Sequence, residues 1–179
     1  MKSLYIILIL LFPTLMNAQA TVYSVEPVPN QDVAYSGNLA EGTFINDLSW
    51  AWNSSIACFP ETQKSKFTGK HIFFTGVIPK YSEMTVTVIP KDPTQNFSVY
   101  AYEIGVNKTD LVPNLSSCIR CEADHFRERD FVGKPPQDHT RIVGNLVAMN
   151  RSYRVVIGVT GANGLDEGEF TLKISTKTR

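Results

Sequence analysis

Three cysteines carry the clearest chemistry in the sequence. They are Cys58, Cys118 and Cys121, with two residues between the last two. A pair at this spacing can be a redox centre, but such pairs belong to a βαβ context that is absent here. With His125, the three thiols would also make a ligand set for zinc. We favour a structural disulfide. The first twenty residues predict an exported chain, and cysteines of exported chains are commonly oxidised.

The pairing of that disulfide is open between two arrangements. Cys58 joined to Cys118 or Cys121 closes a long loop and restrains it most, and we favour this arrangement. Cys118 joined to Cys121 is the alternative. Either arrangement leaves one thiol over.

The three histidines are the candidate catalytic bases. His71 begins an apolar run and is predicted to be structural, whereas His125 lies in a charged run. His139 follows Asp138, yet neighbouring residues on a strand point to opposite faces. The sequence has no G-x-S-x-G, H-E-x-x-H, P-loop or G-x-G-x-x-G motif. A small secreted hydrolase, with its site in segment 105–139 and His125 or His139 as its base, is therefore kept as the alternative function.

Acidic residues gather on and beside a glycine-rich loop near the end of the chain. Asp166, Glu167 and Glu169 supply carboxylates of the kind that hold calcium. Their spacing matches neither an EF-hand nor the nonapeptide calcium repeat. We predict no metal and no cofactor, with calcium here and zinc at the cysteines as the alternatives.

Two aromatic pairs have the spacing that puts both members on one face of a strand. Trp50 and Trp52 make the first pair, and Tyr100 and Tyr102 the second. Exposed aromatic rings could stack on sugar rings. We assign the tryptophans to the core, because a buried Trp contributes so much apolar area. The two tyrosines lie opposite the apolar face of their strand, and we predict that they are exposed and bind ligand.

A dense run of both charges follows the cysteine pair. It extends from Glu122 to Asp130 and includes His125, Arg127 and Arg129. Binding residues are often presented on loops of a rigid scaffold, so we predict that these three residues contact a ligand. The alternative is a solvated loop whose charges pair loosely among themselves.

Alternation of apolar and polar residues with a period of two predicts an all-β fold. Six strands are expected, at 71–78, 83–89, 97–104, 140–148, 153–159 and 169–176. Their apolar faces and the turn residues between them predict a single antiparallel β-sandwich or jelly roll. Segment 39–56 is expected to hold one or two further strands. Residues 105–138 are expected to form a long loop insertion.

The start of the chain has the organisation of a signal peptide. Lys2 precedes an apolar run from Leu4 to Leu15, which ends in Asn17-Ala-Gln-Ala20. This run is shorter than the ~20 residues that span a bilayer. We predict cleavage after Ala18, or after Ala20, and residues 19–179 as one domain. The domain is expected in the periplasm or outside a bacterial cell, with no membrane span.

Charge and composition exclude some classes of partner. Lys and Arg total 17, as do Asp and Glu, so the net charge is zero. Such a chain lacks the positive surplus that nucleic acids and anionic membranes attract. Hydrophobic residues make up 43% of the chain, which excludes a disordered polymer. We expect an extracellular polysaccharide or protein as partner, and leave the oligomeric state open.

Two blocks of the chain resemble the bacterial pre-peptidase C-terminal domain. The first comprises Gly69-Lys-His-Ile-Phe-Phe-Thr75, Pro79-Lys-Tyr-Ser-Glu-Met-Thr-Val-Thr-Val88 and Asn96-Phe-Ser-Val-Tyr-Ala-Tyr102. The second comprises Tyr153-Arg-Val-Val-Ile-Gly-Val159 and Gly168-Glu-Phe-Thr-Leu-Lys-Ile174. The resemblance implies a jelly-roll-like sandwich without catalytic activity, here in a stand-alone form. Asn96 and Ser98 replace acidic residues that this family often carries, so its calcium binding is not carried over. We therefore predict a secreted, non-catalytic binding module.

Overall fold

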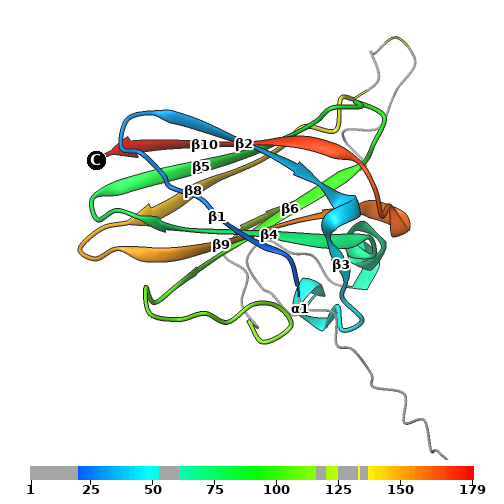
Figure 1. The fold of residues 1–179 in the computed structure, drawn as a ribbon, viewed down its shortest axis with the longest axis horizontal. Helices are drawn as coiled ribbons and strands as arrows, with labels where there is room; N and C mark the ends of the chain where they lie inside the picture. The colour runs from blue at the N-terminus through cyan, green and yellow to red at the C-terminus, as the bar shows by residue number, and fades with distance from the viewer. Residues whose placement is uncertain (1–19, 53–60, 116–119, 125–132, 134–136) are drawn as a thin grey trace, which may run out of the picture.

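Two β-sheets pack face to face to form the molecule (Figure 1). The computed structural model describes residues 20–52, 61–115, 120–124, 133 and 137–179, and the structural statements below concern these ranges. The predicted all-β sandwich is confirmed, with only short helical turns between strands.

The larger sheet, sheet A, has six strands. Its order is β1-β4-β9-β6-β7, and β3 also pairs with β4. All neighbours are antiparallel except β1 and β4, which are parallel. The strands are β1 (Val22–Ser24), β3 (Thr43–Phe44), β4 (Lys70–Ile78), β6 (Phe97–Ile104), β7 (Arg120–Glu122) and β9 (Tyr153–Gly161).

The smaller sheet, sheet B, has four antiparallel strands in the order β2-β10-β5-β8. The strands are β2 (Asp32–Asn38), β5 (Ser82–Pro90), β8 (Arg141–Ala148) and β10 (Glu169–Thr178). A register shift interrupts the β5–β8 pair between Met84 and Val86. Asn145 has a φ of 56° in the same stretch of β8, as a residue in a bulge commonly does.

All six predicted strands are present, and their bounds differ from the prediction by a few residues at most. Segment 39–56 differs more. It contains β3, a short 3-10 turn η1 (Leu39–Glu41) and a one-turn helix α1 (Ser49–Trp52). The Asp47 carboxylate accepts a hydrogen bond from the Ser49 backbone N–H at 2.9 Å, which starts that turn. The tryptophan pair is therefore on a helix and not on a strand. Two more 3-10 turns are η2 (Glu61–Phe67) and η4 (Ala162–Gly164).

The main core lies between the two sheets and follows the alternation read from the sequence. On β5, Met84, Val86 and Val88 are fully buried, and on β10 Leu172 and Ile174 are as well. The residues between them are partly or fully exposed on the outer face of sheet B. One apolar face per strand is what a sandwich core needs.

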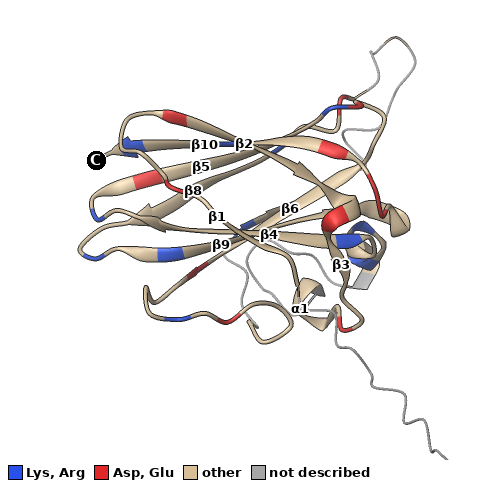
Figure 2. Cartoon of the chain, viewed as in Figure 1, with Lys and Arg blue, Asp and Glu red and all other residues tan. Residues whose placement is uncertain are grey.

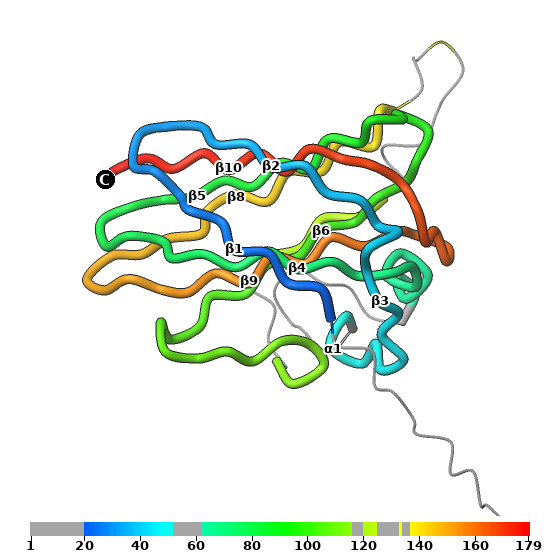
Figure 3. The backbone as a smooth tube through the Cα atoms, in the orientation of Figure 1, coloured from blue at the N-terminus to red at the C-terminus, as the bar shows by residue number. Residues whose placement is uncertain are grey.

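Sheet A departs from this pattern because large parts of both of its faces are buried. The first six residues of β6 are all buried, although alternate side chains of a strand point to opposite faces. The segment after β6 and the segment around α1 run along the side of sheet A that faces away from sheet B (Figure 3). These segments supply the cover for the second face.

Charged residues of both signs are mixed over the turns and outer strands (Figure 2). On sheet B, Lys173 pairs with Asp32 at 2.7 Å and Arg179 with Glu83 at 2.9 Å. Within the described ranges, no helix combines the length and apolar character that crossing a bilayer requires.

Gly158 of β9 provides the space that the ring of Tyr100 occupies on the neighbouring strand β6. A Cβ atom at Gly158 would lie 2.0 Å from Tyr100 Cζ, whereas one at Gly144 of β8 would lie 3.7 Å from its nearest neighbour, Thr85 Oγ1. Gly158→Ala is expected to lower the free energy of unfolding by about 3 kcal/mol, because the core has no room for the methyl group. Gly144→Ala, the matched control, is expected to change it by less than about 0.5 kcal/mol. Urea unfolding of both variants measures this, and equal stabilities would contradict the packing described here.

Candidate functional site

Tyr100 and Tyr102 belong to a second hydrophobic cluster, and the prediction that they are exposed is wrong. Their exposed fractions are 0% and 1%. Both do point away from the main core, as alternation requires, but the segments over the outer face of sheet A cover them. They are therefore unavailable as a surface platform for sugar rings. The buried members of this cluster are Leu48, Trp50, Ala51, Phe67, Phe73, Tyr100, Tyr102, Val112, Cys121 and Val156.

Trp50 lies at the centre of this cluster. Its ring centroid is 4.3 Å from that of Tyr100 and 5.4 Å from that of Phe67. The prediction that Trp50 fills a core is confirmed, although this core is the outer one. The side chain of Trp52 lies outside the described residues.

His71 connects the cluster by two hydrogen bonds. Its Nε2 lies 3.0 Å from the Phe67 carbonyl oxygen, and its Nδ1 lies 2.9 Å from the Tyr100 hydroxyl. A carbonyl can only accept, so Nε2 carries the proton and Nδ1 accepts from the hydroxyl. Burial lowers the pKa of His71 to about 4, which keeps the imidazole neutral at pH 7. The prediction that His71 is structural agrees with these contacts.

A polar network, here called the clamp, joins Asp124 to Gln137, the two ends of a stretch here called the charged segment. It consists of Lys66, Asp124, Gln137 and Arg141. Gln137 Nε2 donates to Asp124 Oδ1 at 2.9 Å, and Lys66 Nζ lies 2.8 Å from Asp124 Oδ2. Burial raises the pKa of Asp124, but the bonds from Lys66 and Gln137 outweigh it and the net direction is downward. The carboxylate therefore stays ionised within the clamp.

Arg141 fixes the clamp to the sandwich. Its side chain is 3% exposed, and its Nε donates to the Phe97 carbonyl oxygen at 2.9 Å. Nη2 lies 3.1 Å from both Asn96 Oδ1 and His139 Nδ1, and both terminal nitrogens lie 3.4 Å from Gln137 Oε1. A guanidinium can only donate, so His139 Nδ1 is an acceptor here. Arg141 is thus a buried cation whose donors have partners.

Asp138 and His139 do not form an oriented acid–base pair. Asp138 Oδ1 accepts a hydrogen bond from the Thr140 backbone N–H at 2.9 Å, and this bond lowers the pKa of Asp138. The carboxylate therefore caps the entry to β8. His125, the other histidine of the hydrolase alternative, lies outside the described residues, as do Arg127 and Arg129.

Cys121 is disulfide-bonded, and it lies on β7 opposite Tyr100 of β6. Cys58 and Cys118 lie outside the described residues, so the pairing stays a prediction.

Glu169, one of the acidic residues considered for calcium, forms an exposed ion pair with Lys91 at 2.5 Å. Among the described residues, no group of three or more His, Cys, Asp or Glu side chains is placed to hold a metal ion.

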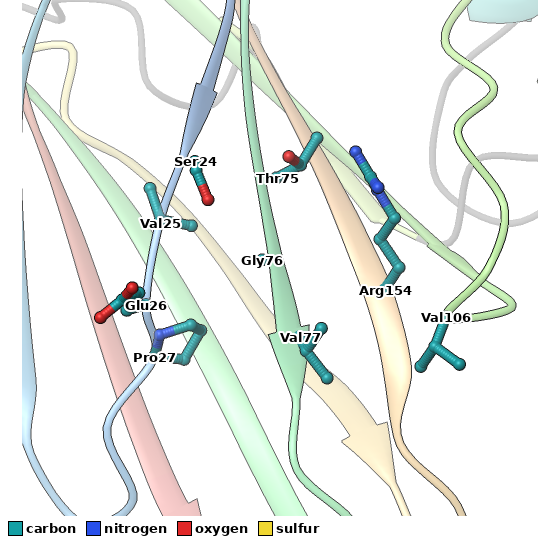
Figure 4. Close-up of a pocket in the computed structure, with 9 residues that line it drawn as sticks. All are labelled: Ser24, Val25, Glu26, Pro27, Thr75, Gly76, Val77, Val106 and Arg154. Atoms are coloured by element: carbon teal, nitrogen blue, oxygen red, sulfur yellow. The ribbon is translucent and has the colours of Figure 1, made fainter.

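A groove of about 410 Å³ lies on the outer side of sheet A, between β1, β4 and the start of the segment after β6 (Figure 4). It is lined by Ser24, Val25, Glu26, Pro27, Thr75, Gly76, Val77, Val106 and Arg154. Val77 and Val106 are 45% and 44% exposed, so the walls offer apolar surface to solvent. In Figure 4 the Glu26 carboxylate is directed away from Arg154, to the other side of β1.

The groove was not foreseen from the sequence, but a signal for it exists. Arg154 lies on β9, two residues before Val156. The two side chains are on the same face of the strand, and Val156 is buried in the second cluster. A lone arginine on an otherwise apolar strand face is the unusual feature. Its register partners, Val77 on β4 and Ile104 on β6, place it in the groove.

Comparison with known proteins gives similarity of architecture only. No family model matches the chain, and no curated protein sequence matches it. Three solved structures share the general β-sandwich architecture at 8–13% sequence identity.

The first is PliG of Aeromonas hydrophila, a periplasmic inhibitor of g-type lysozyme. It has a TM-score of 0.43 and 13% identity, over 87% of this chain and 97% of that one. The second is the pre-peptidase C-terminal domain of a collagenase from Bacillus anthracis. It has a TM-score of 0.41 and 8% identity, over 90% and 99%. The third is CorA, a surface-associated copper-binding protein of Methylomicrobium album BG8, with a TM-score of 0.39 and 10% identity, over 90% and 100%. The second protein belongs to the family that the sequence resembles, and no family model places this chain in it.

The buried imidazole of His71 makes stability depend on pH. The pKa of His71 is about 4 in the folded chain, against 6.5 for a histidine in an unfolded chain. Between these two pH values the unfolded state therefore binds more protons than the folded state. Stability is therefore full above pH 6.5 and falls as the pH drops toward 4. Between pH 7 and pH 5 the loss is expected to be about 2 kcal/mol.

Urea unfolding at the two pH values measures this loss. His71→Gln is the comparison, because glutamine has a donor and an acceptor but does not titrate. Its stability should change less between pH 7 and pH 5. Parallel pH profiles of the two proteins would contradict the assignment.

Gln137 ties Asp124 to Arg141, so its loss should loosen the ends of the charged segment without unfolding the sandwich. Gln137→Ala is expected to speed tryptic cleavage after Arg127 and Arg129 about fivefold, since removal of such bonds lowers the free energy of local opening. Mass spectrometry of the early fragments identifies the cut sites. Gln31→Ala, at an exposed turn, is the control, and equal cleavage rates in all three proteins would rule out a clamp at this position.

Proposed function

We propose that this chain is an exported, non-catalytic binding module that contacts a protein partner through the segment between Asp124 and Gln137. The observation that carries the proposal is the clamp. Asp124 and Gln137 are hydrogen-bonded at 2.9 Å, and Arg141 attaches them to β6 and β8. A charged segment whose two ends are held on a rigid sandwich resembles the arrangement of many binding loops.

The residue types of the segment support a protein as the partner. His125, Arg127 and Arg129 alternate with acidic residues in this part of the sequence. Mixed charges of this kind recognise a surface with a complementary pattern of both signs. The argument for a polysaccharide depended on Tyr100 and Tyr102, and these side chains are buried.

The contacts of His71 and His139 favour binding over hydrolysis. His71 uses both ring nitrogens inside the second cluster, and His139 Nδ1 accepts from Arg141. The Asp138 carboxylate caps the backbone of Thr140. Each of these groups already has a structural task. Export follows from the predicted leader, with residues 1–18 removed and the chain in the periplasm or the medium.

The proposal is tested with the mature protein as bait for the periplasmic and secreted proteins of the source cell. Arg127→Ala/Arg129→Ala should lose the specific partner, whereas Lys80→Ala/Lys177→Ala, at the opposite end of the sandwich, should retain it. The partner is then purified, and its affinity for the three proteins is measured. A loss of about tenfold or more is expected in the arginine variant.

Three results would overturn the proposal. Equal affinity of the two double variants would exclude the segment as the contact. Binding on a glycan array, without a protein partner, would replace the protein by a polysaccharide. Retention of the chain in the cytoplasm with residues 1–18 intact would remove the export on which the proposal depends.

A further inference from the structure

We propose that the groove around Arg154 is a second binding site, which takes a carboxylate carried on a small apolar group, as at the C-terminal residue of a peptide. The site is independent of the clamp. Arg154 is paired in register with Ile104 at the end of β6, whereas Arg141 binds the carbonyl of Phe97 at its beginning. The two sites therefore lie at opposite ends of one strand.

Arg154 is a half-buried arginine that lacks hydrogen-bond partners among the described residues. Its Nε is buried without a hydrogen-bond partner, and among the described residues no ion pair or hydrogen bond engages its guanidinium. Leaving a buried N–H donor without an acceptor is unfavourable, so this Nε needs an explanation. A ligand that accepts from the guanidinium supplies one.

Arg141 provides the internal comparison. It lies on β8, is equally part of the sandwich, and donates to Phe97, Asn96 and Gln137. This fold therefore satisfies an arginine fully where the arginine has a structural role. In the part of the chain that the structure describes, Arg154 has no such set of acceptors, and its side chain lies in a groove that is open to solvent.

The surroundings of Arg154 select the chemical class of the ligand. Arg154 is the only cation among the residues that line the groove, and one guanidinium matches one carboxylate in charge and in planar geometry. A phosphate dianion would call for more positive charge than the single guanidinium provides. Ser24 and Thr75 bring hydroxyl groups that can donate to the same oxygens.

The walls of the groove account for the apolar part of the ligand. Val25, Pro27, Val77 and Val106 line the same groove as Arg154, and Val77 and Val106 are about half exposed. Apolar walls with one fixed polar group are typical of small-ligand sites. A volume of about 410 Å³ is of the size that holds one or two residues of a peptide.

The proposal is tested by titration of the mature protein with N-acetyl-leucine, followed by nitrogen–proton correlation NMR. The signals of the Arg154 Nε–H group and of the Gly76 and Val106 backbone are expected to shift. N-acetyl-leucinamide has the same apolar group without the carboxylate and should shift them little, and inorganic phosphate should bind at least about tenfold more weakly than the carboxylate.

Variants separate a binding role from a structural one. Arg154→Met is expected to weaken binding of N-acetyl-leucine about tenfold or more, and to leave the melting temperature unchanged or raised, because a buried Nε–H without an acceptor is removed. Arg151→Met, at the exposed turn before β9, is the matched control and should bind as the unaltered chain does.

Each remaining outcome counts against the site. Equal shifts with the acid and the amide, or with phosphate, would contradict carboxylate recognition, and no shift with N-acetyl-leucine would exclude the site altogether. Binding that survives Arg154→Met would place the ligand elsewhere. Should that variant fail to fold, the comparison of acid with amide on the unaltered chain still decides the question.

Discussion

Sheet A must be covered on both faces, and the rest of the structure follows from that requirement. Strands β4, β6 and β9 carry apolar or aromatic side chains on their inner and outer sides. Sheet B covers the inner side. The outer side carries Phe73, Tyr100 and Tyr102, which would be exposed if nothing lay over them. The segments around α1 and after β6 cover these side chains and form a third layer. Burial of this much aromatic surface stabilises the arrangement strongly.

The parts of the fold that depend on local alternation could be predicted, and those that depend on the third layer could not. Strands β5 and β10 show one apolar and one polar face, and their pattern in the sequence is unambiguous. For Tyr100 and Tyr102, alternation correctly assigns the face but says nothing of what covers it. Tyrosine occurs at both solvent-exposed and buried positions, since its ring is apolar and its hydroxyl polar. A nearby signal existed in Gly158, whose missing side chain gives the Tyr100 ring its place.

The candidate sites show the same division. The charged segment stands out in the sequence, and its position between two strands follows from turn patterns. The clamp does not, because Lys66, Asp124 and Arg141 are far apart in the chain and meet only once both sheets have formed. The sequence also does not predict that Arg141 finds acceptors for its guanidinium whereas the Nε of Arg154 finds none among the described residues. Both lie within apolar strands, and only the neighbouring strands decide whether acceptors surround the guanidinium.

The strand order of sheet B has a consequence for how the chain acquires its structure. Strand β10 lies between β2 and β5, and among the described strands it alone pairs with β2. Until residues 169–178 have emerged from the ribosome, β2 lacks this partner and the main core lacks Leu172 and Ile174. Contacts of such long sequence separation form late and slowly. The sandwich therefore cannot close until β10 has been synthesised, and the strands made before it keep the inner face of sheet B incomplete up to that point.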